Sequence, residues 1–151
     1  MKLLNLKNDT PIGIYFRIAF ISNHYRDQVN RIVEKKYGLT RSEFALLFCL
    51  NQIDYITASD VTEFTQLPKN SISRGVAILI NKELATSVKD PNNRRKNILK
   101  ITSKGKKLAK NISGHLVEAN TRLTSSLTDE EAQTLEFILE KICVNTSPKS
   151  S

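Results

Sequence analysis

Three successive cations, Arg94, Arg95 and Lys96, follow a turn-forming Asp-Pro-Asn-Asn run, and Lys89 stands just before it. Guanidinium and ammonium groups bind phosphate oxygens, and arginine in particular reaches into narrow, strongly negative minor grooves. We therefore expect Arg94 to enter a minor groove of DNA. The neighbouring lysines and arginine would hold the phosphates on either side.

A second group of candidate residues lies upstream, in the run PKNSISRGVAILINKEL. Its apolar residues have the i, i+4, i+7, i+8 spacing of a buried helical stripe, namely Ile72, Val76, Leu79 and Ile80. The other face carries small hydrogen-bonding side chains and cations: Lys69, Asn70, Ser71, Ser73 and Arg74. A slim face without an acid near its start is suited to reading base edges in a DNA groove. The alternative is an ordinary solvated face, although such faces usually mix Glu with Lys.

The net charge of +8 is concentrated in the middle of the chain. Residues 61–110 hold twelve basic and three acidic residues, whereas residues 1–60 hold eight and six, and residues 111–151 hold three and six. A positive field confined to one part of a chain is the electrostatic footprint of a surface that binds a polyanion. The charge distribution therefore favours nucleic acid as the partner.

Other chemistries find little support. The chain has no phosphate-binding glycine loop, nucleophile elbow or cluster of metal ligands, so we expect no enzyme, cofactor or metal site. Cys49 and Cys143 stand in apolar helical contexts, which predicts buried thiols in a reducing cytoplasm, with redox sensing by Cys49 as the alternative. No apolar run approaches the ~20 residues of a membrane span, and the first residues do not resemble a signal peptide.

These residues must be positioned by helices, and 151 residues with 40% hydrophobic and 25% charged content suit one globular domain. Apolar periodicity predicts six helices, at about 11–36, 41–52, 57–66, 68–84, 102–127 and 128–145. Thr40 with Glu43, and Thr128 with Glu131, have capping-box spacing, and Thr57 caps the third helix. Gly105 and Gly114 are expected to weaken the fifth helix. Residues 145–151 are expected to form a flexible tail.

The runs LATSV and NILKIT are short, β-branched and roughly alternating, so they predict a hairpin. Two short helices joined by a tight turn and followed by a hairpin make a winged helix-turn-helix. The predicted fold is thus mainly α with a small β-hairpin wing, in which residues 40–104 form the DNA-binding lobe. The first helix also has more aromatic residues at its start than one core stripe needs, so we expect it to meet another subunit.

At these residues the chain resembles the MarR-type (multiple antibiotic resistance) winged-helix regulators. The family's wing signature, Asp-Pro-x-Asp-Arg-Arg…Leu-Thr-x-x-Gly, is matched by Asp90, Pro91, Arg94, Arg95, Ile101, Thr102 and Gly105. Upstream, LPKNSISRGVAILINKEL is similar to the family's recognition helix. Ser71, Ser73 and Arg74 occupy the positions that usually face DNA.

The resemblance implies one MarR-like domain over residues 1–151, with residues 11–37 and 106–144 as dimerisation helices. It implies a cytoplasmic homodimer that binds an inverted-repeat operator on double-stranded DNA and acts as a repressor, with no membrane partner. A small aromatic or anionic effector would bind between the dimerisation helices and the DNA-binding lobe, releasing the protein from DNA.

Three positions depart from the family's pattern. The second Asp of the signature, which braces the wing arginine, is Asn93; its oxygen can still accept a hydrogen bond, but it carries no charge. Glu83 stands where a glycine usually follows the recognition helix, so we expect no left-handed glycine cap there. Ser87 replaces a basic residue of the first wing strand. These changes predict weaker or altered DNA contacts on an unchanged fold.

Two further functions remain compatible with the residues. A non-specific architectural DNA-binding protein would use the same cations on phosphates, and only its ratio of specific to non-specific affinity would differ. A protein-interaction module on a winged-helix fold would not need the basic wing. Specific reading is favoured over an architectural role by four side chains of base-reading types, Asn70, Ser71, Ser73 and Arg74. The cations at residues 94–96 argue against a protein-interaction module.

Overall fold

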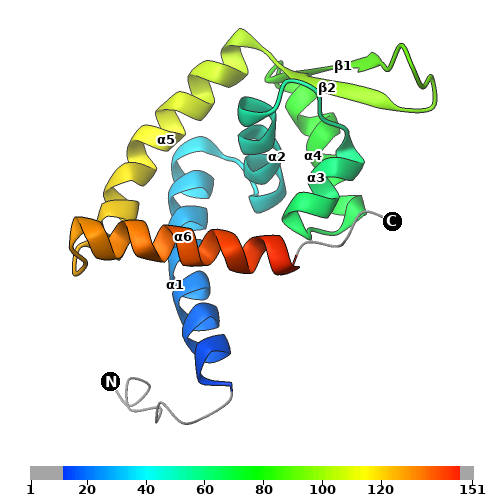
Figure 1. Cartoon of the computed structure of the whole chain (residues 1–151). Coiled ribbons are helices and arrows are strands. Elements are labelled where there is room, and N and C mark those ends of the chain that lie inside the picture. The colour runs from blue at the N-terminus through cyan, green and yellow to red at the C-terminus, as the bar shows by residue number, and fades with distance from the viewer. Residues whose placement is uncertain (1–11, 147–151) are drawn as a thin grey trace. The chain divides into compact units, whose positions relative to one another are not determined.

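The computed structural model describes residues 12–146, and this part of the chain is mainly helical with one β-hairpin (Figure 1). The elements are α1 (Gly13–Tyr37), α2 (Arg41–Gln52), α3 (Ala58–Thr65), α4 (Lys69–Asn81), β1 (Ala85–Lys89), β2 (Asn97–Ile101), α5 (Ser103–Thr124) and α6 (Asp129–Thr146). The predicted fold class is confirmed. The chain divides into two compact units between Leu116 and Val117. Pro11, expected in the first helix, lies outside the described residues.

The core of the first unit is built mainly by α2, α3, α4 and the hairpin. Leu46, Val61, Ile72 and Leu79 are fully buried there. Burying an aliphatic side chain of this size stabilises the fold by about 1.5–3 kcal/mol. The predicted buried stripe of α4 is confirmed at Ile72 and Leu79, is met in part at Val76, which is half-buried against the core, and is wrong at Ile80, which is 38% exposed. An α-helix turns about 100° per residue, so the i+8 position lies well to one side of the line through Ile72 and Leu79.

The helix starts follow the local signals. The hydroxyl of Thr40 accepts a hydrogen bond from the Glu43 amide, and the Glu43 carboxylate accepts one from the Thr40 amide, which completes the predicted capping box. Thr57 forms a second box with Asp60 at the start of α3. Pro68 was expected in the first turn of α4 but is its N-cap residue.

The end of α4 is a left-handed turn even though no glycine is present. Glu83 has φ of +60°, its amide donates to the Ile80 carbonyl, and the Leu84 amide donates to the Leu79 carbonyl. These two bonds form a Schellman motif, and Leu79 and Leu84, which make the second bond, are both buried. The expectation that Glu83 would remove the left-handed glycine cap is therefore met only in part, since the conformation is kept and a glutamate adopts it.

The wing is an antiparallel pair in which Ala85 faces Ile101 and Lys89 faces Asn97. A third segment, which the sequence did not reveal, joins the sheet at one residue. The Leu99 amide donates to the Ile56 carbonyl at 2.9 Å, and both side chains are buried. This bridge attaches the base of the wing to the segment between α2 and α3.

Thr102 joins the end of α4 to the wing and to α5. Its amide donates to the Leu84 carbonyl at 3.1 Å, and its hydroxyl donates to the Glu83 carbonyl at 2.7 Å. The same hydroxyl accepts a hydrogen bond from the Gly105 amide. A Cβ on Gly105 would lie 2.2 Å from the Leu84 carbonyl oxygen. Gly105, which matches the wing signature, was expected to weaken the helix, but its position permits a close backbone approach that any larger residue would block.

Candidate nucleic-acid interface

Helix α4 presents one polar face because its other face is held in the core. Asn70, Ser73 and Arg74 are exposed, whereas Ser71 is half-buried. The Arg74 Nε donates to the Asn70 carbonyl at 3.4 Å, which leaves the rest of the guanidinium directed to solvent. Lys69 is the first residue of the helix and is also exposed. The five residues predicted from sequence thus lie together in the first two turns of α4.

The wing tip is shaped by two side chains that bond to the backbone of their own turn. The Asp90 Oδ1 accepts from the Asn92 amide at 2.8 Å, and the Asn93 Oδ1 accepts from the Arg95 amide at 3.1 Å. The backbone closes the turn, with the Asp90 amide donating to the Lys96 carbonyl. Because an amide oxygen accepts such a bond as a carboxylate does, Asn93 keeps the turn formed. Its contact is with the backbone of Arg95.

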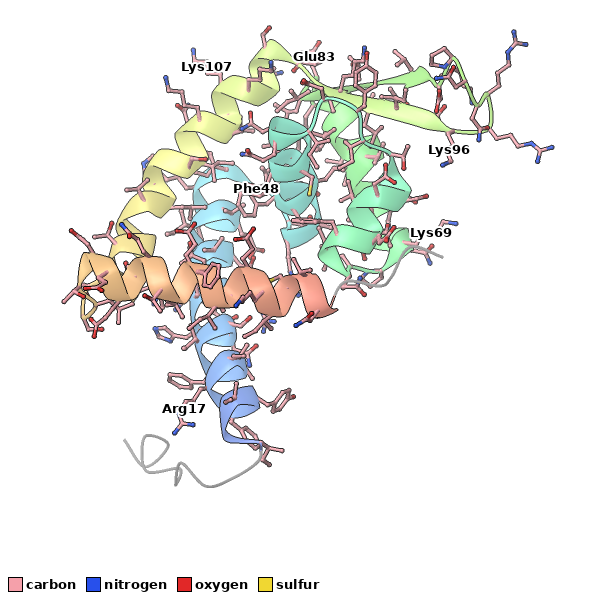
Figure 2. All side chains as sticks on the ribbon, viewed as in Figure 1. Arg17, Phe48, Lys69, Glu83, Lys96 and Lys107 are labelled. Carbon is pink, nitrogen blue, oxygen red and sulfur yellow. The ribbon has the colours of Figure 1, made fainter. Side chains whose placement is uncertain are left out.

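The cations of the wing are exposed and have no acidic partner. Within the described residues the ion pairs join Lys82 to Glu43 and Lys104 to Glu83, so none involves Lys89, Arg94, Arg95 or Lys96. Figure 2 shows the labelled Lys69 and Lys96 on the same side of the first unit, whereas Lys107 points away from it. Exposed cations thus lie both at the start of α4 and on the wing, and together they offer a surface that a polyanion could neutralise.

Helix α3 contributes to the same surface, which the sequence analysis missed. A shallow hollow of about 230 Å³ lies between α3 and α4 and is lined by Ala58, Ser59, Thr62, Glu63, Lys69 and Ser73. Ser59 and Glu63 are one helical turn apart, so they lie on the same face of α3. In the sequence, this i, i+4 pair of polar residues was the available indication that α3 shares the surface, but such pairs are common on solvated helices.

A second, apolar cavity of about 480 Å³ lies on another part of the first unit, between α1, α2, the end of α3 and Leu116 of α5. Phe44, Phe48 and Phe64 supply aromatic walls, and Phe48 is labelled in Figure 2. Two cations, Arg26 and Arg41, are also among the lining residues. The volume falls within the range of pockets that hold small organic ligands.

The cysteines differ from each other in burial. Cys49 is buried at the wall of the apolar cavity, and this burial raises the pKa of its thiol, as expected for a structural cysteine. Cys143 is exposed, so the prediction that it is buried is wrong. The apolar residues Leu135, Ile138, Leu139 and Ile142 of α6 are 38–46% exposed as well.

Neither a metal site nor a membrane span is found in the part of the chain that the structure describes. No three His, Cys, Asp or Glu side chains there are grouped so that they could hold a metal ion. His115 instead bonds to Tyr37 and Lys36 of α1. The helices of residues 12–146 are too short or too polar to cross a bilayer.

Comparisons with known proteins agree with this geometry. Residues 37–96 match the sequence model of the MarR family. A MarR transcriptional regulator from Methanosarcina mazei Go1 superimposes with a TM-score of 0.77 and 23% identity, over 87% of this chain and 94% of that one. The transcriptional regulator SlyA gives 0.76 and 21%, over 89% and 94%.

A MarR mutant from E. coli, solved in complex with operator DNA, superimposes with a TM-score of 0.66 and 18% identity, over 89% of this chain and 99% of that one. No curated protein sequence matches the chain. The matched residues 37–96 run from the end of α1 to the wing tip and include every candidate DNA-binding residue. The chain thus has the fold of the MarR-type regulators, and its helix-turn-helix and wing carry the MarR family's sequence pattern.

Proposed function

We propose that the chain is a dimeric, sequence-specific DNA-binding regulator that represses transcription. The observation that carries the proposal is the exposed surface at the start of α4 and on the wing. It combines base-reading side chains such as Asn70 and Arg74 with unpaired phosphate-binding cations at the wing tip. The related E. coli protein bound to operator DNA supports the same use of this fold.

Dimerisation is supported by apolar side chains that one chain leaves exposed. On α1, Ile14 and Tyr15 are 70% and 67% exposed, and on α6, Phe137 is 57% exposed. Each helix carries several such exposed apolar side chains, and clusters of them mark surfaces that another protein covers. We assign α1 and α6 to the dimer interface, which would place two reading surfaces about one DNA turn apart.

Release by a small effector is supported by the chemistry of the apolar cavity. Aromatic side chains in its wall suit a flat hydrophobic ring, and Arg26 and Arg41 suit a carboxylate or another anion. The effector would thus be a small aromatic anion. A regulator of this kind works where the chromosome is, so we place the protein in the cytoplasm.

Selection of bound sequences from a random duplex pool tests the reading surface. We expect enrichment of an inverted repeat with half-sites about 10 bp apart, bound roughly 1,000-fold more tightly than random DNA. Uniform, salt-sensitive binding without enrichment would instead identify an architectural protein. Failure to bind any DNA would identify a protein-interaction module.

Three further measurements test the finer parts of the proposal. Sedimentation equilibrium should give a dimer, and a monomer at micromolar concentration would refute the assigned interface. In vitro transcription from a promoter that carries the selected site should fall when the protein is added, and a rise would identify an activator. Salicylate, as a simple aromatic anion, should weaken operator binding in the wild type and less in an Arg41→Ala variant.

A further inference from the structure

We propose that Glu63 of α3 is a specificity-determining residue that accepts a hydrogen bond from the exocyclic amino group of a cytosine in the major groove. The inference rests on the proposed function, since it assumes that the surface of α3 and α4 faces DNA. It adds a helix to the reading surface, and a carboxylate that differs from that of Asp90, which is bonded to the backbone of its own turn in the wing.

The position of Glu63 is fixed by the way α3 packs. Val61 is fully buried and holds α3 against the core, while Ser59 and Glu63 are exposed. Both line the hollow of about 230 Å³ that also contains Lys69 and Ser73. Glu63 therefore lies at the junction of the two helices, beside the residues of α4 that are expected to meet base edges.

The carboxylate of Glu63 is available to a ligand. Of the two acidic residues of α3, Asp60 bonds to Thr57 in the capping box. Glu63 makes no side-chain hydrogen bond in the described part of the chain, and the ion pairs found there leave it out although Lys69 lines the same hollow. The hydrogen bond that Glu63 contributes at the end of α3 comes from its backbone carbonyl, which accepts from Gln66. The fold therefore does not need the carboxylate.

A carboxylate on a DNA-facing surface is unfavourable unless the DNA offers it a donor. Phosphates repel it, which weakens binding to DNA of arbitrary sequence. In the major groove, the cytosine N4 amino group is a donor with no acceptor beside it on the same base, and Glu accepts from it. Adenine also offers an N6 donor there, but its N7 acceptor repels the second carboxylate oxygen, whereas guanine presents only acceptors and thymine an acceptor and a methyl group. Glu63 would thus penalise most sequences and favour those with cytosine at one position of each half-site.

The test compares the sequences that three proteins select from a random duplex pool. These are the wild type, Glu63→Gln, and Asp54→Asn as a control with the same charge change at an exposed residue between α2 and α3 that does not line the hollow. Helical content of each is checked by circular dichroism. Affinities for the selected site, for the same site with the cytosine replaced, and for random duplex are then measured at one salt concentration.

We expect the wild type and the control to select cytosine at one position and to lose about tenfold in affinity when it is replaced. Glu63→Gln should lose that preference or change it to adenine, because an amide pairs with the N6 and N7 of adenine. It should also bind random duplex more tightly than the wild type does.

Two outcomes would overturn the inference in different ways. If Glu63→Gln selects the same sequence with the same ratio of specific to random affinity, Glu63 is a solvated side chain, and the proposed regulator still stands. If the wild type binds duplex DNA but enriches no sequence, sequence-specific regulation and this role of Glu63 both fail.

Discussion

Replacing Gly105 by alanine should destabilise the protein, although alanine is the better helix former. The added Cβ would lie 2.2 Å from the Leu84 carbonyl oxygen and 2.8 Å from Cγ1 of Ile101, whereas ordinary contacts begin at 3.4 Å. The start of α5 must therefore move away from Leu84, which breaks the bond from the Thr102 amide at 3.1 Å. That bond contributes about 0.5–1.5 kcal/mol, and overpacking costs about 1–3 kcal/mol.

The gain in helix propensity, about 1 kcal/mol, offsets part of this cost. We expect a net loss of about 1–3 kcal/mol in the free energy of unfolding. Gly114→Ala is the matched control, because it makes the same change in the same helix with no atom within 4 Å of the new Cβ. It should stabilise the protein by up to about 1 kcal/mol.

Urea titrations of the wild type and both variants at one protein concentration measure these changes. The Gly105→Ala variant should also bind the selected operator more weakly, since the wing is attached at the displaced junction. If both variants were stabilised to the same extent, the close approach of α5 to Leu84 would be absent and the reasoning refuted.

Glu83→Gly should raise the melting temperature, because glycine adopts the left-handed conformation of that residue without the Cβ cost of about 1–2 kcal/mol, which exceeds the contribution of the exposed ion pair with Lys104. Lys104→Ala removes the same ion pair and is the control; a Glu83→Gly variant no more stable than this control would contradict the Schellman assignment. Arg94→Ala should weaken operator binding by about 1–3 kcal/mol in fluorescence anisotropy. Lys107→Ala makes an equal charge change on the side that points away from Lys69 and Lys96 in Figure 2, and it should have little effect. Equal losses of affinity in both variants would indicate purely non-specific electrostatic binding. Hydrogen bonds from Thr128 lower the pKa of the Glu131 carboxyl below its ordinary value of 4.5, so its contribution to the stability of α6 is present above that pH and is lost as the pH falls below it. Helical content followed by circular dichroism should show this acid-dependent loss in the wild type and a smaller one in Thr128→Ala, and identical profiles would refute the role of the cap.

Features set by neighbouring residues were predictable from the sequence. The start of α2 follows from the capping box at Thr40, because its two hydrogen bonds join residues three apart. The turn at Asp90 and the flanking strands followed from residue type in the same way. The polar face of α4 was predictable because Ile72 and Leu79 define the opposite one.

Features that depend on residues distant in the sequence were missed or misread. Gly105 lies against Leu84, and nothing near either residue indicates that contact. The bridge from Ile56 to Leu99 pairs β2 with a single residue of the segment between α2 and α3. A single residue cannot show the alternating pattern that predicts a strand. The hollow that brings Glu63 beside Lys69 and Ser73 depends on how α3 packs on α4, which the sequence of a single helix does not reveal.

The three hydrogen bonds of Thr102 have a consequence for the thermodynamics of binding. They fix the end of α4, the base of the wing and the start of α5 to one another before any ligand arrives. Conformational entropy lost on association should therefore come chiefly from residues 90–96, since the strands on either side are already paired. Calorimetry should accordingly give a heat-capacity change close to that of rigid surfaces meeting, and not the more negative change that accompanies folding of a disordered segment on binding.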